Sequence, residues 1–205
     1  TRPPVFNESA PLRARVLSGG EWSAINEATF FAGDPAEPSN LTVSELMYNP
    51  PGSSEDLEFI ELVNLSGTDT IELGGAKFTE GVQFSFPINT RLAPGGRLLL
   101  VSDEEAFVSH YGPGLPIVGQ YDGLLDNSGE QLVIENFTGN VILNFTYNDG
   151  SEWPSGSDGE GYSLVSRDSD LSDALSWRDS DERMGNPGES DNTRFSGLPS
   201  TDEDR

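Results

Sequence analysis

Residues 41–62, LTVSELMYNPPGSSEDLEFIEL, decide the fold class. Apolar residues occupy most alternate positions of 41–48, and β-branched and aromatic residues are dense from residue 57 onward. Both patterns are typical of β-strands. Pro50-Pro51-Gly52 cannot continue a ladder, because two of these residues lack an N–H and glycine adopts turn dihedrals. The segment therefore predicts two strands, 41–48 and 57–64, joined by a loop.

Three carboxylates lie inside these otherwise apolar strands, and a buried charge needs a cation, a basic side chain or backbone donors as its partner. One alternative is calcium, which takes carboxylate, carbonyl and amide oxygens. The candidate calcium ligands are Glu45, Glu58, Glu61, Asp149 and Asp158. In the other alternative Glu45 or Glu61 caps backbone N–H groups or pairs with an arginine such as Arg97 or Arg178. The sequence leaves both open.

The rest of the chain reads as short strands separated by turns, with one short helix. The further expected strands are 70–73, 76–79, 83–86, 97–101, 116–120, 131–137, 141–147 and 162–166. Ser102-Asp103-Glu104-Glu105 forms a capping box with Ser102 as the N-cap, and the helix ends near Tyr111, before Gly112. An all-β sandwich with one short helix follows from this pattern.

Charge and composition restrict the classes of partner. The chain has 11 basic and 35 acidic residues, a net charge of −24, and no cysteine. Binding to nucleic acid requires basic residues that neutralise phosphates, and anionic membrane surfaces attract the same residues. We therefore predict no nucleic-acid partner, and no apolar run is long enough for membrane insertion. The charge and the lack of disulfides favour an extracellular or cell-surface bacterial protein.

Several motifs in order resemble the lamin-tail domain, an immunoglobulin-like module of nuclear lamins that is also widespread in secreted bacterial proteins. They are V-S-E-L-M-Y-N-P-P at 43–51, E-F-I-E-L-V-N at 58–64, L-G-G-A-K-F at 73–78, F-S-F-P at 84–87, L-A-P-G-G-R at 92–97, and the later W-P at 153–154, D-G at 158–159 and S-W-R at 176–178. The bacterial pattern often has tryptophan where Ala76 stands. The resemblance implies an immunoglobulin-like β-sandwich from a multidomain secreted protein.

Composition shifts along the chain predict the domain organisation. Residues 1–31 are either the C-terminal fragment of a preceding β-sandwich or an N-terminal extension, and residues 32–40 form a linker. Residues 41–188 form the lamin-tail-like sandwich. Residues 189–205 offer little to bury and are expected to be an acidic flexible tail or linker.

Catalytic chemistry has little support in the sequence. His110 is the only histidine, so a Ser/His/Asp triad and a two-histidine zinc site are both disfavoured. Paired carboxylates could serve a glycosidase, but small sandwiches seldom form a deep cleft. Rings in or beside loops could instead stack on sugars, although Trp153 could equally plug one end of the sandwich. These candidate ligand-binding rings are Tyr48, Tyr121, Trp153 and Tyr162.

Together these patterns predict a non-catalytic module of a larger secreted or surface protein, acting in adhesion, docking or spacing. Its partner would be a protein or a cell-surface polysaccharide that the sequence does not identify. A carbohydrate-binding module is the alternative, and a glycoside hydrolase ranks third.

Overall fold

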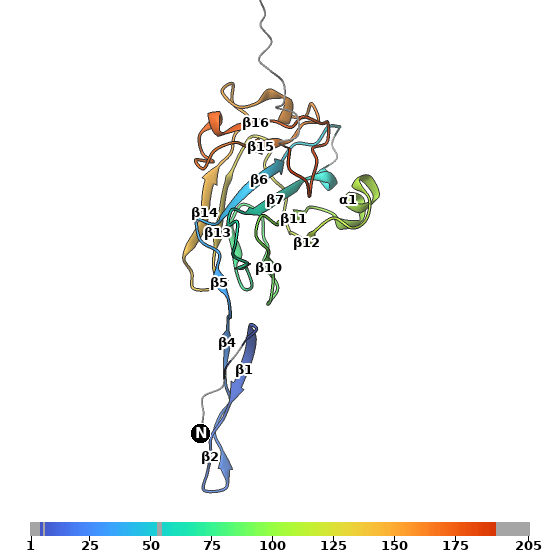
Figure 1. Cartoon of the computed structure of the whole chain (residues 1–205). Helices are drawn as coiled ribbons and strands as arrows, with labels where there is room; N and C mark the ends of the chain where they lie inside the picture. Colours follow the sequence, from blue (N-terminus) through green and yellow to red (C-terminus); the bar gives the residue numbers. More distant parts are fainter. Residues whose placement is uncertain (1–4, 6, 53–54, 192–205) are drawn as a thin grey trace, which may run out of the picture.

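The computed structural model describes residues 5, 7–52 and 55–191, and its main body is a β-sandwich (Figure 1). One layer is a six-stranded sheet in the order β12-β11-β7-β6-β15-β16. It contains β6 (Leu41–Met47), β7 (Phe59–Asn64), β11 (Arg97–Val101), β12 (Ile117–Gln120), β15 (Leu164–Ser166) and β16 (Trp177–Asp179). The two leading strands and the loop between them agree with the sequence prediction.

Two three-stranded sheets complete the sandwich. One, in the order β14-β13-β9, contains β9 (Lys77–Glu80), β13 (Gln131–Glu135) and β14 (Val141–Thr146). The other, in the order β10-β8-β5, contains β5 (Asp34–Pro35), β8 (Ile71–Glu72) and β10 (Arg91–Leu92). The expected strand at 83–86 makes only isolated bridges, of Gln83 to Asp122 and of Ser85 to Lys77. The predicted immunoglobulin-like β-sandwich with one helix is confirmed.

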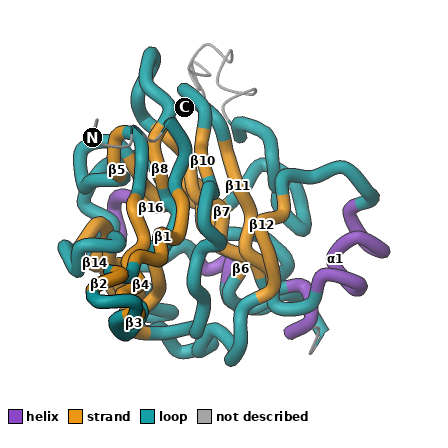
Figure 2. The backbone as a smooth tube through the Cα atoms, turned by 90° about the horizontal axis from the view of Figure 1, so that it is seen from below, coloured by secondary structure: helices purple, strands orange, loops and turns teal. Residues whose placement is uncertain are grey.

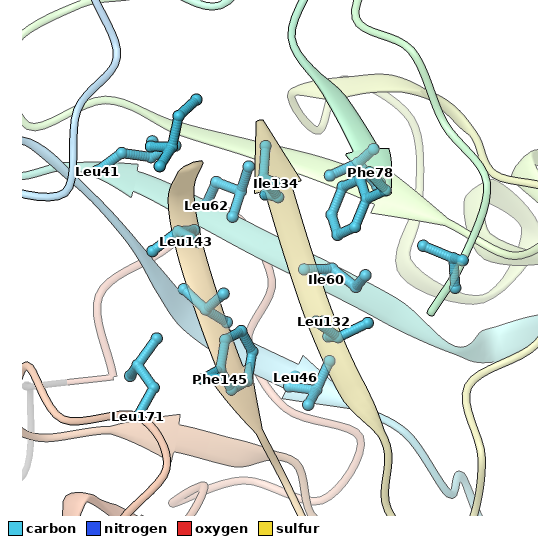
Figure 3. Close-up of a cluster of buried hydrophobic side chains, with 14 of the residues drawn as sticks. Leu41, Leu46, Ile60, Leu62, Phe78, Leu132, Ile134, Leu143, Phe145 and Leu171 are labelled. Carbon is cyan, nitrogen blue, oxygen red and sulfur yellow. The ribbon is translucent and has the colours of Figure 1, made fainter. Parts of the chain in front are cut away.

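The core lies between β6 and β7 on one side and β13 and β14 on the other (Figure 3). Alternate residues point inward, as the period of two requires. The buried side chains include Leu46, Ile60, Leu62, Ile134 and Phe145. Burying each of them stabilises the fold by about 1.5–3 kcal/mol, so this layer of contacts holds the two sheets together.

A β-bulge in β6 sets the register that matters for the polar residues. Val43 pairs with Leu62, the register shifts at Ser44, and Glu45 then pairs with Glu61. A bulge places one extra residue on one strand and re-aims its side chains. Two carboxylates thus lie directly opposite each other on neighbouring strands.

The helix α1 (Glu104–Tyr111) begins one residue later than predicted. Asp103 is the N-cap, and its carboxylate accepts the N–H of Ala106 at 2.8 Å. The Ser102 hydroxyl instead donates to the carbonyl of Glu55 at 2.6 Å, which removes it from the cap. The expected end at Gly112 is confirmed, with the Gly112 N–H donating to Val108. Figure 2 shows α1 beside β12, at one edge of the six-stranded sheet.

An N-terminal ribbon projects from the sandwich (Figure 1). It consists of β1 (Ala10–Ala14) paired with β4 (Asn26–Phe30), followed outward by β2 (Leu17–Ser18) paired with β3 (Glu21–Trp22). All residues of β2, β3 and β4 are exposed. The ribbon therefore draws little stability from the core.

The stretch 32–40 is more than the linker expected. Its β5 pairs in parallel with β8, and Ala36 is fully buried in the core. Two prolines and two acids indicated a linker, but the short pairing with a distant strand includes the stretch in the sandwich. At the other end, residues 189–191 are described and Asp191 is buried, whereas the remainder of the expected acidic tail, 192–205, lies outside the described residues.

Candidate functional site

The face of the six-stranded sheet that points away from the core, here the outer face, is divided into two halves. The apolar half contains Met47, Phe59, Leu99 and Val101, which pack against Phe107 of α1. The polar half is defined by Ser44, Glu45, Glu61 and Arg97. These residues come from the same strands β6, β7 and β11, two or three positions away from Met47, Phe59 and Leu99.

A C-terminal strap, residues 181–191, lies on the polar half. Three backbone groups attach the strap to three different elements. The Met184 carbonyl accepts the Tyr111 hydroxyl of α1 at 2.6 Å. The Asn186 N–H donates to Glu45 at 3.2 Å, and the Gly188 N–H donates to Glu61 at 2.6 Å. The strap is therefore held by hydrogen bonds to the sheet and the helix.

Glu61 is completely buried and both of its carboxylate oxygens are occupied. Oε1 accepts the Ser44 hydroxyl at 2.6 Å and forms an ion pair with Arg97, and Oε2 accepts the Gly188 N–H. Buried carboxylates persist only when they are paired and hydrogen-bonded in this way. Glu61 thus pairs with Arg97 and at the same time accepts the Gly188 N–H of the strap.

Glu45 is buried beside it, but no cation is bonded to it in the described part of the chain. Its Oε1 accepts the Ser163 hydroxyl and the Asn186 N–H. Burial raises the pKa of Glu45 to about 8; the Ser163 hydrogen bond opposes the rise, and the nearby charge of Glu61 adds to it. Burial therefore favours the protonated form of Glu45, which lies next to the Arg97-paired Glu61.

A pocket of about 260 Å³ lies between the strap and the polar half. Glu45, Glu61 and Arg97 form its floor, and Arg167, Asp168 and Glu189 belong to the loops around it. Charges of both signs line it, so its electrostatics select neither a simple cation nor a simple anion.

Glu58 lies elsewhere, near the core. The Tyr121 hydroxyl donates to its Oε2 at 3.0 Å, and the Leu125 N–H donates to the same oxygen at 2.9 Å. Burial raises the pKa of Glu58 to about 7, and these two hydrogen bonds oppose the rise. Its Oε1 is buried without a partner among the described residues. Glu58 is therefore structurally separate from the Glu45–Glu61 pair.

The five candidate calcium ligands do not converge. Asp158 accepts the side-chain N–H of Asn49 at 2.8 Å in a loop, and Asp149 lies exposed in the same late region. In the described ranges, no group of three or more acidic or histidine side chains could hold a metal ion. The geometry of Glu45 and Glu61 corresponds to the other alternative, capping and pairing with Arg97. Arg178 pairs with Asp181 and Asp191 of the strap.

For two of the four candidate ligand-binding rings, the predicted position at the surface is wrong. Tyr48 and Tyr121 are buried in the core, where the Tyr48 ring packs 5.0 Å from that of Tyr147 and the Tyr121 hydroxyl donates to Glu58. Trp153 is half-buried against the core, with its ring centroid 6.4 Å from that of Trp177, as the plug alternative proposed. Tyr162 is also half-buried. These four rings do not form an exposed row.

Sequence reasoning missed the residues that donate hydrogen bonds to the buried carboxyl groups of Glu45 and Glu61. These are Ser163, Asn186 and Gly188, which lie more than 100 positions from Glu45 or Glu61. The segment Gly185-Asn186-Pro187-Gly188 contained a signal, since it is a strong turn pattern in a region otherwise read as polar. A turn that exposes backbone N–H groups is a suitable partner for a carboxylate that needs donors.

Comparison with known proteins identifies the sandwich. The family model described as Lamin Tail Domain matches residues 34–149, which is more than half of the chain. No curated protein and no solved structure matches the sequence. The matched range contains β5 to β14, including the bulged β6–β7 hairpin and both buried glutamates of the polar half. The chain belongs to the lamin tail domain family.

Proposed function

We propose that this protein is a non-catalytic docking module of a secreted or surface-attached bacterial protein, and that the projecting ribbon makes the contact. The observation that carries this proposal is the tip of the ribbon. Four large apolar side chains there are exposed, at 67% for Val16, 53% for Leu17, 54% for Trp22 and 58% for Ile25. Clusters of exposed apolar residues mark interaction sites on soluble proteins.

The tip has the composition of a protein-binding surface. Leu17 and Trp22 are direct cross-strand partners, and the Arg15 guanidinium lies 4.3 Å from the centroid of the Trp22 ring. Tryptophan and arginine dominate the energetics of protein interfaces. The tip also lies at the end of the ribbon away from the acidic sandwich, which lets a partner approach it with little repulsion (Figure 1).

An enzymatic role has one supporting feature, a pocket lined by two glutamates in different environments. Its geometry is unfavourable for hydrolysis. Glu45 and Glu61 are direct cross-strand partners, and glycosidase pairs need room between them for a sugar or a water. Both oxygens of Glu61 are already bonded, and the strap covers the pair. These features support a structural role for both acids.

The docking proposal can be tested by site-specific crosslinking, because the chain has no cysteine of its own. Ser18→Cys carries a photoreactive group at the tip, and Thr138→Cys carries the same group on an exposed turn of the sandwich as the matched control. Bacterial surface proteins and surface polysaccharides are offered as separate fractions. We expect protein adducts from Ser18→Cys only, reduced at least tenfold by Trp22→Ala, since hot-spot residues contribute about 2 kcal/mol or more.

Equal yields at the two positions, or yields that Trp22→Ala leaves unchanged, contradict docking through the tip. Retention on the polysaccharide fraction would favour the carbohydrate-binding alternative. Release of reducing sugars from that fraction, lost in Glu45→Gln, would favour the hydrolase.

A further inference from the structure

Gly185 and Asn186 of the strap contact the Glu45 carboxyl directly. A Cβ added to Gly185 would lie 2.1 Å from Glu45 Oε1 and 2.9 Å from the Ser163 hydroxyl. The backbone at Met184 and Gly185 has positive φ, at 69° and 72°, a conformation that only glycine adopts freely. The strap thus adopts a strained turn where it contacts the Glu45 carboxyl.

Of the two facing glutamates under the strap, only Glu61 has a bonded basic partner among the described residues. Arg97 is the cation bonded there, and its partner is Glu61. An ionised Glu45 would lie opposite the Glu61 carboxylate, with Asp191 of the strap also near. The charged and titratable groups around Glu45 are Glu61 on β7, Arg97 on β11, Tyr111 on α1, Arg167 and Asp168 after β15, and Glu189 and Asp191 on the strap. Both nearest acids oppose ionisation of Glu45.

We propose that the strap is a proton-controlled cover, which stays closed on the polar half while Glu45 is a neutral acid and detaches when Glu45 loses its proton. Ionisation of Glu45 requires solvation of its carboxylate, and Gly185 and Asn186 cover that carboxyl on the strap side. Detachment widens access to Glu45, Glu61 and Arg97, which line the pocket. This device is independent of the docking proposal, because it involves the opposite end of the chain.

The direction of the pH effect follows from the pKa of Glu45, which burial raises from 4.5 to about 8. The closed form holds a proton that the open form releases between these two pH values. The contribution of the Glu45 proton to closure is therefore fully present below about pH 4.5 and is lost as the pH rises toward 8, by up to about tenfold in the open-to-closed ratio per pH unit. Above about pH 8 the effect levels off.

The test is amide hydrogen exchange by NMR, read at Asn186 and Gly188 and corrected for the intrinsic rate at each pH. In the wild-type chain we expect protection of both amides to fall from about pH 6 to 8. Glu45→Gln keeps a carbonyl acceptor for Asn186 and Ser163 but cannot ionise, so its strap protection should not depend on pH. Glu58→Gln is the matched control, because it removes another buried acid that does not touch the strap.

Two further readouts make the outcome decisive. The carboxyl carbon of Glu45, followed in the wild-type chain, should titrate near 8, and an ordinary value near 4.5 overturns the proposal. The Ile60 amide on β7 reports opening of the sandwich, and equal loss of its protection would mean global unfolding. A Glu45→Gln chain with the wild-type pH dependence also overturns the proposal. If Glu45→Gln fails to fold, the wild-type carboxyl titration and the Ile60 comparison decide alone.

Discussion

The apolar and polar halves of the outer face are built on the same strands, yet they are covered in different ways. On the apolar half, Phe107 of α1 packs edge-on against Phe59, with ring centroids 5.7 Å apart. On the polar half, the strap is held by hydrogen bonds to Glu45 and Glu61. Apolar contact is non-directional and insensitive to pH, whereas the free energy of burying a carboxyl group depends on whether it is ionised. One sheet face thus has one cover whose apolar contacts do not depend on pH and a second cover whose hydrogen bonds go to titratable carboxyl groups.

This contrast has a local cause in the sequence of the covers. The helix presents aromatic side chains at Phe107 and Tyr111, one turn apart, which lie on the same side of a helix. The strap has no aromatic side chain, and its contacts with Glu45 and Glu61 are made by the backbone N–H groups of Asn186 and Gly188. A cover held largely through its backbone N–H groups needs buried acceptors, which explains why acids lie in strands that otherwise look apolar.

Removing the apolar anchor should have the largest effect. Phe107→Ala leaves a cavity beside Phe59 and should lower the free energy of unfolding by about 3–5 kcal/mol, equally at low and high pH. Urea denaturation measures this, with the exposed helix residue Ser109→Ala as the control. A loss that changed strongly with pH would show that the two halves are not independent.

Breaking the polar anchor should have the next largest effect. Glu61→Gln leaves Arg97 without its carboxylate and weakens the bond from Gly188, so we expect a loss of about 3 kcal/mol. Arg97→Met in the same chain should recover part of that loss, because the uncompensated charge is then gone. Urea denaturation of the two single variants and the double variant measures the coupling. Strictly additive losses would contradict the pairing described here.

Calcium should have the smallest effect. The oxygens of Glu61 and Oε1 of Glu45 already accept hydrogen bonds, so a metal would have to displace the strap. We expect matched thermal melting curves in calcium chloride and in sodium chloride of equal ionic strength, since screening acts on all charges alike. A calcium-specific rise that shrinks in Glu45→Gln would instead support the metal site predicted from the sequence.

The sequence was most accurate where the pattern is local. Alternation in residues 41–48 and the turn at Pro50-Pro51-Gly52 place β6 and β7 within about two residues of their ends. The strand at 97–101 is found as β11 with the same bounds. Such patterns succeed because side-chain period and turn dihedrals depend on neighbours in the chain.

Errors arose where a distant residue decided between local options. Ser102 and Asp103 can both cap a helix, and the choice was made by the carbonyl of Glu55, 47 positions earlier. Tyr121 was expected at the surface, and Glu58 holds its hydroxyl in the interior. The three-residue β16 was missed, because it exists through pairing with β15 and has little pattern of its own.

The sequence by itself determined an all-β chain with a lamin-tail pattern, a strongly acidic surface, and buried acids that require partners. Only the tertiary structure decided which partners they have. The strap amide that reaches Glu61 is 127 positions away, and the one that reaches Glu45 is 141 positions away. No local period links residues so far apart, because such contacts form only when both layers of the sandwich are in place and the chain end is brought back over the sheet.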